Sequence, residues 1–240
     1  MKQFLQRNGV FITLSLILII ALGLALLCIP KGNLHLLLCD RHTHARDIFY
    51  RYYTHVAEWF PYIVCLALIF FSRLGEGLCA STAMLGSTLT TQLFKHIIRA
   101  PRPVTWFSTN MPEVQLPLVE GVKMNRWLSF PSGHTTAFFA LAFILSIVAG
   151  NYLINKNCQS GNQNGPSRNK IYLAQVFLIQ VVLFIMAATG GYSRIYLCQH
   201  FALDVLAGIV VGVLISLISY VVFYQYKDRN WYNYRILSKK

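Results

Sequence analysis

Charged side chains are scarce in this sequence, and acidic ones are the scarcest. Only 12% of its 240 residues are charged, whereas 55% are hydrophobic, and a typical soluble domain has about 25% charged residues. This shortage excludes an ordinary soluble globular domain. Eight acidic residues against 21 Lys and Arg leave a net charge of +13. Nucleic-acid binding would fit that charge, but basic anchors at a membrane together with a cationic site explain it better.

The six cysteines form no framework for disulfides or metal binding. The sequence has no Cys-x-x-Cys pair and no zinc-ligand spacing. The segment His-Thr-His at 42–44 could hold a metal ion, but a solvated loop is the better interpretation. Cys39 and Cys198 could meet on the outer side of a membrane. The sequence favours unpaired thiols there and leaves the question open.

Long apolar runs predict an all-α integral membrane protein with a single domain over residues 1–240. A hydrocarbon core of about 30 Å needs about 20 apolar residues in a helix, and six such runs are present. The third is weak in hydropathy and rich in Ser, Thr, Gly and Ala, which is typical of a helix buried against other helices. The expected spans are about 10–29, 56–72, 78–94, 133–150, 171–188 and 201–225.

Details of these runs set the expected topology. The first run follows Lys2 and Arg7, as in a signal peptide, but its apolar length favours an uncleaved span. Six spans place both ends of the chain on one side. The positive-inside rule gives only a weak preference for one orientation in the membrane, because an inner N-terminus puts 11 of the 21 basic residues inside. We expect both ends inside, a flexible polar inner loop at 155–170, and close helix packing at the Gly208-x3-Gly212 pair.

Three polar clusters lie at the ends of predicted spans, and with six spans all three fall on the same membrane face. They are KHIIRAPRP at 95–103, FPSGH at 130–134, and YSRIYLCQHFALDVLAG at 192–208. Each alone has a structural explanation, as an interfacial anchor, a helix cap or a satisfied helical histidine. Ionisable groups at membrane depth are nevertheless candidates for function.

Together, the clusters have the composition of a phosphate site. Lys95, Arg102 and Arg194 supply three cations, and arginine pairs its donors with phosphate oxygens. Ser132 and Gly133 add a hydroxyl and backbone N–H groups at a helix N-terminus, which suits an anion. The sequence therefore predicts a pocket for a phosphoryl group.

Two histidines accompany these cations. His200 and Asp204 are four residues apart, so we expect their side chains on one helical face. A buried carboxylate needs a partner, and an imidazole N–H supplies one. With His134 on a different helix, the pocket would hold a nucleophile and an acid.

The sequence resembles the type 2 phosphatidic acid phosphatase (PAP2) superfamily of membrane lipid phosphatases. The signature of that family has three parts, K-x6-R-P, P-S-G-H and S-R-x5-H-x3-D. They stand here at 95–103, 131–134 and 193–204. Every defining position matches in the right order. The six-helix layout agrees too, so the resemblance spans most of the chain and implies a PAP2-type helical bundle.

The resemblance also implies roles for these residues. His200 would be the nucleophile that forms a phosphohistidine, and Asp204 would orient its ring. His134 would protonate the leaving oxygen and then activate water. The phosphoryl oxygens would be bound by the remaining signature residues, Lys95, Arg102, Ser132, Gly133 and Arg194. No metal and no other cofactor is expected, because fixed cations take the place of a metal.

The expected activity is metal-independent hydrolysis of a phosphomonoester or pyrophosphate on a membrane lipid. The chain would lie in a bacterial inner membrane with its site facing the periplasm, and its oligomeric state is left open. Candidate substrates are lipid A phosphate, undecaprenyl pyrophosphate, phosphatidic acid and phosphatidylglycerol phosphate. Alternatives are a phosphotransferase and a non-catalytic transporter or scaffold. Extra cations in the outer loops would suit a multiply phosphorylated headgroup, although charged side chains exposed to solvent are the ordinary interpretation. These cations are Arg41, Arg46, Arg51, Lys123 and Arg126.

Overall fold

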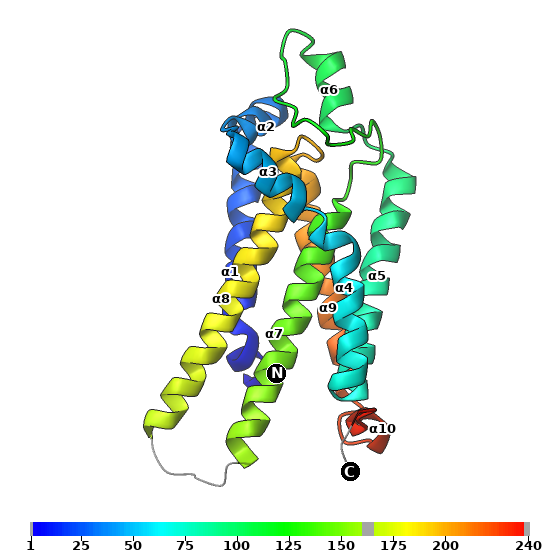
Figure 1. Ribbon diagram of the computed structural model, residues 1–240. Coiled ribbons are helices and arrows are strands. Elements are labelled where there is room, and N and C mark those ends of the chain that lie inside the picture. The colour runs from blue at the N-terminus through cyan, green and yellow to red at the C-terminus, as the bar shows by residue number, and fades with distance from the viewer. Residues whose placement is uncertain (1, 160–165, 238–240) are drawn as a thin grey trace.

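The computed structural model describes residues 2–159 and 166–237. This part of the chain contains ten helices joined by connections without regular structure, and it has no strand. The helices are α1 (Lys2–Cys28), α2 (Lys31–Cys39), α3 (His44–Tyr53), α4 (Val56–Phe71), α5 (Leu74–Ile98), α6 (Pro103–Asn110), α7 (Gly133–Gln159), α8 (Pro166–Tyr196), α9 (Ala202–Tyr224) and α10 (Asn230–Asn233). The long helices α1, α4, α5, α7, α8 and α9 form an elongated bundle (Figure 1). They overlap the six apolar runs.

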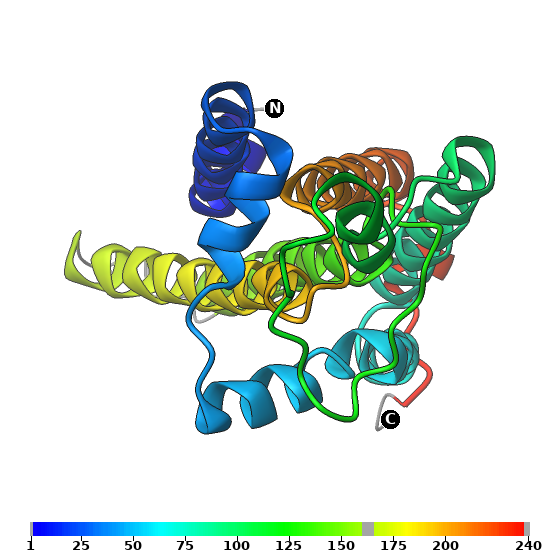
Figure 2. The same ribbon diagram turned by 90° about the horizontal axis from the view of Figure 1, so that it is seen from above.

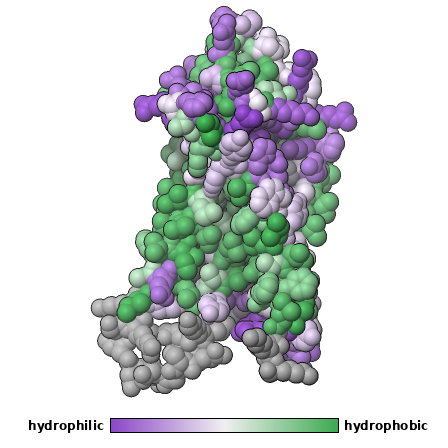
Figure 3. Space-filling view, in the orientation of Figure 1, coloured by the Kyte–Doolittle hydropathy of each residue, from purple (hydrophilic) through white to green (hydrophobic). Residues whose placement is uncertain are grey.

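Four of these helices, within α1, α7, α8 and α9, are long and apolar enough to cross a membrane. Helices α3 and α4, bent by 40° at the break between them, make at most a fifth span. In the described residues, α5 does not reach this apolarity, in keeping with its Ser, Thr and Gly content. The structure is thus all-helical with four to five candidate spans. Apolar side chains cover the long helices, and polar ones gather at the end with α2, α3 and α6 (Figure 3).

Helix α7 lies at the centre of the bundle and contacts α1, α4, α5, α8 and α9 (Figure 2). Its apolar window is 61% buried inside the protein, against 11% to 28% for the other three spans. Phe139 and Phe143 are fully buried, and the ring of Phe11 from α1 stacks on Phe143 at a centroid distance of 5.4 Å. The start of α7 is therefore held on several sides.

Two glycines bring α9 against α7, as the sequence predicted. A Cβ atom added to Gly208 would lie 2.8 Å from the carbonyl oxygen of Ser132, and one added to Gly212 would lie 2.7 Å from that of Thr136. Real Cβ contacts are essentially never that short. The absence of side chains at these positions lets the second and third turns of α9 touch the start of α7.

The connections at the two ends of the bundle are more helical than expected. The outer segments contain α2, α3 and α6, which hydropathy did not predict. Thr43 caps α3 by accepting a hydrogen bond from the N–H of Arg46 at 3.4 Å, and Pro103 begins α6. The predicted inner loop is wrong at 155–159 and 166–170, which continue α7 and α8; 160–165 lie outside the described residues. Apolar length marks the hydrocarbon layer, not the helix end.

The glycine contacts give a stability prediction. We expect Gly208→Ala and Gly212→Ala each to destabilise the protein by about 1–3 kcal/mol, the usual cost of overpacking. Gly23→Ala in α1 is the matched control, because a Cβ there meets nothing within 4 Å. Thermal unfolding in detergent measures the difference. Equal melting temperatures for all three variants would contradict this account of the α7–α9 contact.

Candidate active site

The three clusters meet at the end of the bundle that carries α2, α3 and α6. Lys95 lies in the last turn of α5, Arg102 between α5 and α6, and Arg194 in the last turn of α8. Their charges act on one another and on His134, the second residue of α7. The structure therefore brings the predicted cations close to one another around the start of α7, and we call this region the pocket.

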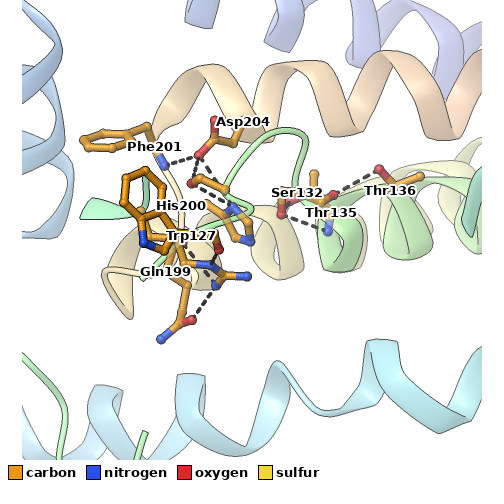
Figure 4. Close-up of polar contacts among 10 residues, drawn as sticks. Trp127, Ser132, Thr135, Thr136, Gln199, His200, Phe201 and Asp204 are labelled. Atoms are coloured by element: carbon orange, nitrogen blue, oxygen red, sulfur yellow. Dashed lines mark hydrogen bonds and ion pairs between the residues drawn. The ribbon is translucent and has the colours of Figure 1, made fainter. Parts of the chain in front are cut away.

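His200 and Asp204 do not share a helical face, contrary to our prediction. Helix α9 begins at Ala202, so His200 lies in the connection before it. The pair still meets, with His200 Nδ1 3.5 Å from Asp204 Oδ2. The reason is a cap: the same Oδ2 accepts a hydrogen bond from the N–H of Phe201 at 2.9 Å, which folds the preceding residue back over the helix end (Figure 4).

Ser129 joins this pair and was missed from the sequence. Its hydroxyl donates to Asp204 Oδ2 at 2.5 Å and lies 3.5 Å from His200 Nδ1. Its N–H donates to the carbonyl oxygen of Ala100 at 3.0 Å, which links this residue to the Lys95–Pro103 segment. The signal available was its place directly before FPSGH.

His200 is 1% exposed. Burial lowers the pKa of His200 to about 3, against the opposing effect of the Asp204 carboxylate. The imidazole is therefore neutral at ordinary pH. Because Asp204 and Ser129 approach Nδ1, the lone pair of Nε2 is left for another partner.

Arg102 is held from two sides. Its Nε donates to the carbonyl oxygen of Trp127 at 3.1 Å, and its Nη1 donates to Gln199 Oε1 at 2.7 Å (Figure 4). Gln199 in turn donates through Nε2 to the carbonyl oxygen of Lys123 at 3.1 Å. Gln199, the neighbour of His200, was also missed. A neutral amide at this place fixes the guanidinium without cancelling its charge.

Arg194 and Lys95 complete the cationic side of the pocket. Arg194 is 6% exposed, and its Nη1 donates to the hydroxyl of Thr54. Its Nε has no hydrogen-bond partner among the described residues. A Cβ added to Gly133 would lie 3.7 Å from Lys95 Nζ, so the glycine leaves open the space in front of the ammonium group.

Ser132 caps α7. Its hydroxyl accepts hydrogen bonds from the N–H of Thr135 at 3.4 Å and from the hydroxyl of Thr135 at 2.8 Å. Its own N–H donates to the carbonyl oxygen of Asp204 at 2.9 Å. The start of α7 and the start of α9 are thus hydrogen-bonded to each other beside His200.

His134 faces α4. Its Nε2 lies 3.3 Å from Glu58 Oε1, and its side chain is 27% exposed. Glu58 also pairs with His55 at 3.0 Å. This carboxylate was missed, although an acid is rare in this chain and Glu58 stands at the start of a predicted span.

A groove of about 340 Å³ lies between α4, α5 and α7 and includes Lys95 and His134 in its lining. It is lined by Ala57, Glu58, Tyr62, Ser87, Thr88, Thr91, Gln92, Lys95, Gly133, His134, Thr136 and Ala137. A larger cavity of about 610 Å³, lined in part by Arg73, Glu76 and Arg235, contains none of the signature residues. The groove, not the larger cavity, reaches a signature cation and a histidine.

Buried cations, a capped helix start and two histidines define an anion site suited to phosphoryl transfer in a helical bundle. Residues 76–229 match the PAP2 superfamily, and because this is more than half of the chain, the protein belongs to that superfamily.

Two relatives come from Porphyromonas gingivalis. A lipid A 4'-phosphatase is 25% identical over 185 residues, 75% of this chain and 67% of the relative. A lipid A 1-phosphatase is 30% identical over 113 residues, 47% of this chain, but the match spans only 20% of that protein. The crystal structure of Aquifex aeolicus LpxE shares the fold at a TM-score of 0.56 and 23% identity, over 78% of this chain and 92% of that one.

Proposed function

We propose that this protein is a phosphatase that hydrolyses a phosphate monoester of lipid A through a phosphohistidine. The observation that carries the proposal is the groove between α4, α5 and α7, which ends at Lys95 and His134. A lipid headgroup in that groove would reach Lys95 and His134, while the acyl chains would stay outside the groove, against the apolar surface of the bundle. The two lipid A phosphatase relatives narrow the lipid class.

The first step follows from the position of His200. Asp204 and Ser129 lie at Nδ1, so Nε2 attacks phosphorus, the N–P bond forms, and the bond from phosphorus to the sugar oxygen breaks. His134 gives its proton to the departing oxygen. Lys95, Arg102 and Arg194 stabilise the charge that develops on the phosphoryl oxygens.

The second step releases phosphate. His134, now neutral, takes a proton from water; the water oxygen bonds to phosphorus, and the N–P bond to His200 breaks. Glu58 Oε1 lies 3.3 Å from His134 Nε2, so in this proposal the carboxylate orients the imidazole ring in both steps. The chain's own cations supply the charge, so these steps use no metal.

The site faces the periplasm in this proposal, with α5 as a sixth span buried against its neighbours. The outer loop cations do not line the groove: Arg46 donates to the carbonyl oxygen of Arg41 at 2.7 Å, and Arg51 to that of Glu120 at 3.1 Å. Of these two contacts, the one from Arg51 ties α3 to the α6–α7 connection, and in this proposal selectivity for the headgroup rests on the residues that line the groove.

Phosphate release from a panel of lipids tests the substrate. With purified protein in detergent, we expect release from lipid A and little from undecaprenyl pyrophosphate, phosphatidic acid or phosphatidylglycerol phosphate. Mass spectrometry of the product assigns the 1- or 4'-position. His200→Ala is the inactive control. Faster release from any other lipid refutes the choice of lipid A, and a labelled phosphate found on an added lipid acceptor instead of in solution indicates a phosphotransferase.

The two histidines differ in their dependence on the leaving group. An alkyl or sugar oxygen is a poor leaving group, whereas a nitrophenolate departs unaided. We expect His134→Ala to lose about 10²–10⁴-fold on a lipid phosphate and clearly less on nitrophenyl phosphate. His200→Ala should lose activity on both, because no phosphoenzyme forms. If the two variants lost activity by the same factor on both substrates, the assigned roles of His134 and His200 would be contradicted.

Labelling of introduced cysteines tests the orientation. A membrane-impermeant maleimide added to cells with a permeable outer membrane should label Lys123→Cys, which lies in the α6–α7 connection. It should label Asp228→Cys, between α9 and α10, only after the inner membrane is opened. The parent protein measures background from native thiols. The reverse pattern would place the site in the cytoplasm.

A further inference from the structure

A second cluster of reactive side chains lies beside the active site and takes no part in the proposed reaction. His35 and Cys39 are four residues apart on α2, and Cys198 lies in the α8–α9 connection, two residues before His200. One side-chain ligand atom from each lies within 4.8 Å of the other two. The three residues are at most 1% exposed.

The buried imidazole of His35 lacks hydrogen-bond partners in the described part of the chain. Neither Nδ1 nor Nε2 has a hydrogen-bond partner among the described residues. Its neighbours are the rings of Phe107 and Phe201, at centroid distances of 5.6 and 5.1 Å. Buried polar groups are normally satisfied, so an unpartnered imidazole at this depth points to something that the polypeptide does not supply.

The two cysteines are free thiols with weak partners. Cys39 Sγ lies 3.7 Å from the carbonyl oxygen of Leu36, and Cys198 Sγ lies 3.9 Å from that of Pro117. Two thiolates and one imidazole are a donor set that selects Zn²⁺ or Cu⁺. Two thiolates also neutralise a dication, which makes a buried centre tolerable.

The three ligand atoms lie somewhat farther apart than the ligands of a single bound ion. Zinc binds sulfur at about 2.3 Å and nitrogen at about 2.0–2.1 Å, so tetrahedral ligand atoms lie roughly 3.5–3.8 Å apart. Contraction of the cluster by about 1 Å would reach that geometry. A carbonyl oxygen beside either sulfur, or a water molecule, could fill a fourth position.

We propose that His35, Cys39 and Cys198 bind one thiophilic metal ion, Zn²⁺ or Cu⁺, which fastens α2 to the connection that carries His200. The ion is structural and takes no part in phosphoryl transfer. Cys198 has a φ of 51°, a backbone conformation that residues other than glycine rarely adopt. Such conformations persist where the surroundings hold them firmly, and a metal bond at this residue would provide that hold.

Metal analysis of the full-length protein tests the site. The protein is purified in detergent without a polyhistidine tag, loaded with Zn²⁺ or Cu⁺, desalted, and measured by elemental mass spectrometry. We expect about one ion per chain. Cys39→Ser, Cys198→Ser and His35→Ala should each weaken binding by more than about 100-fold, since loss of an outer-shell partner alone costs about 10–100-fold. Cys65→Ser, which removes a buried thiol of α4 outside the cluster, should keep the ion.

Two results would overturn the proposal. One is a wild-type protein that retains no ion after loading. The other is a Cys39–Cys198 disulfide, detected when both thiols resist alkylation under denaturing conditions until a reductant is added. If a ligand variant fails to fold, Co²⁺ loading of the wild type still decides, because bound thiolates give a charge-transfer absorption in the near ultraviolet that free Co²⁺ lacks. None of these measurements uses phosphatase activity, so they stand or fall apart from the proposed function.

Discussion

The Asp204 carboxylate is the group on which the geometry of the site depends. One oxygen accepts the Ser129 hydroxyl and the N–H of Phe201 and lies 3.5 Å from His200. The backbone carbonyl of the same residue accepts the N–H of Ser132. A single residue in the first turn of α9 thus joins the segment 129–132 before α7 to the connection that carries His200. It is 4% exposed, and a buried carboxylate is stable only with such partners.

The close approach of α7 and α9 makes these hydrogen bonds reachable. Gly208 lies one turn beyond Asp204, and a side chain there would strike Ser132. The backbone contact and the hydrogen bond from Ser132 therefore support the same arrangement. Because functional groups must be held within a fraction of an ångström, we infer that the packing of two apolar helices sets the precision of the polar site above it.

Much of this could be predicted from the sequence, because membrane helices and motif spacing are strong local signals. The six apolar runs overlap the six long helices, and the Gly208–Gly212 contact is confirmed. The errors have a common cause: the predictions used periodicity, and the site depends on where helices stop. His200 was placed on a helix that begins two residues later. The partners Ser129, Gln199 and Glu58 carry no spacing signal, since they meet the site only through tertiary contacts.

The scarcity of acidic residues extends to the site, where the two arginines are held by neutral hydrogen-bond partners. Arg102 is positioned by carbonyl and amide oxygens and Arg194 by a hydroxyl, so neutral partners fix both guanidinium groups without cancelling their charge. Asp204 is occupied by hydrogen bonds at the far side of His200. A carboxylate beside each arginine would have stabilised the empty pocket and competed with the ligand. In the proposed reaction, a phosphate dianion would meet two guanidinium groups that neutral hydrogen-bond partners have already oriented, so binding would relieve part of the cost of burying them.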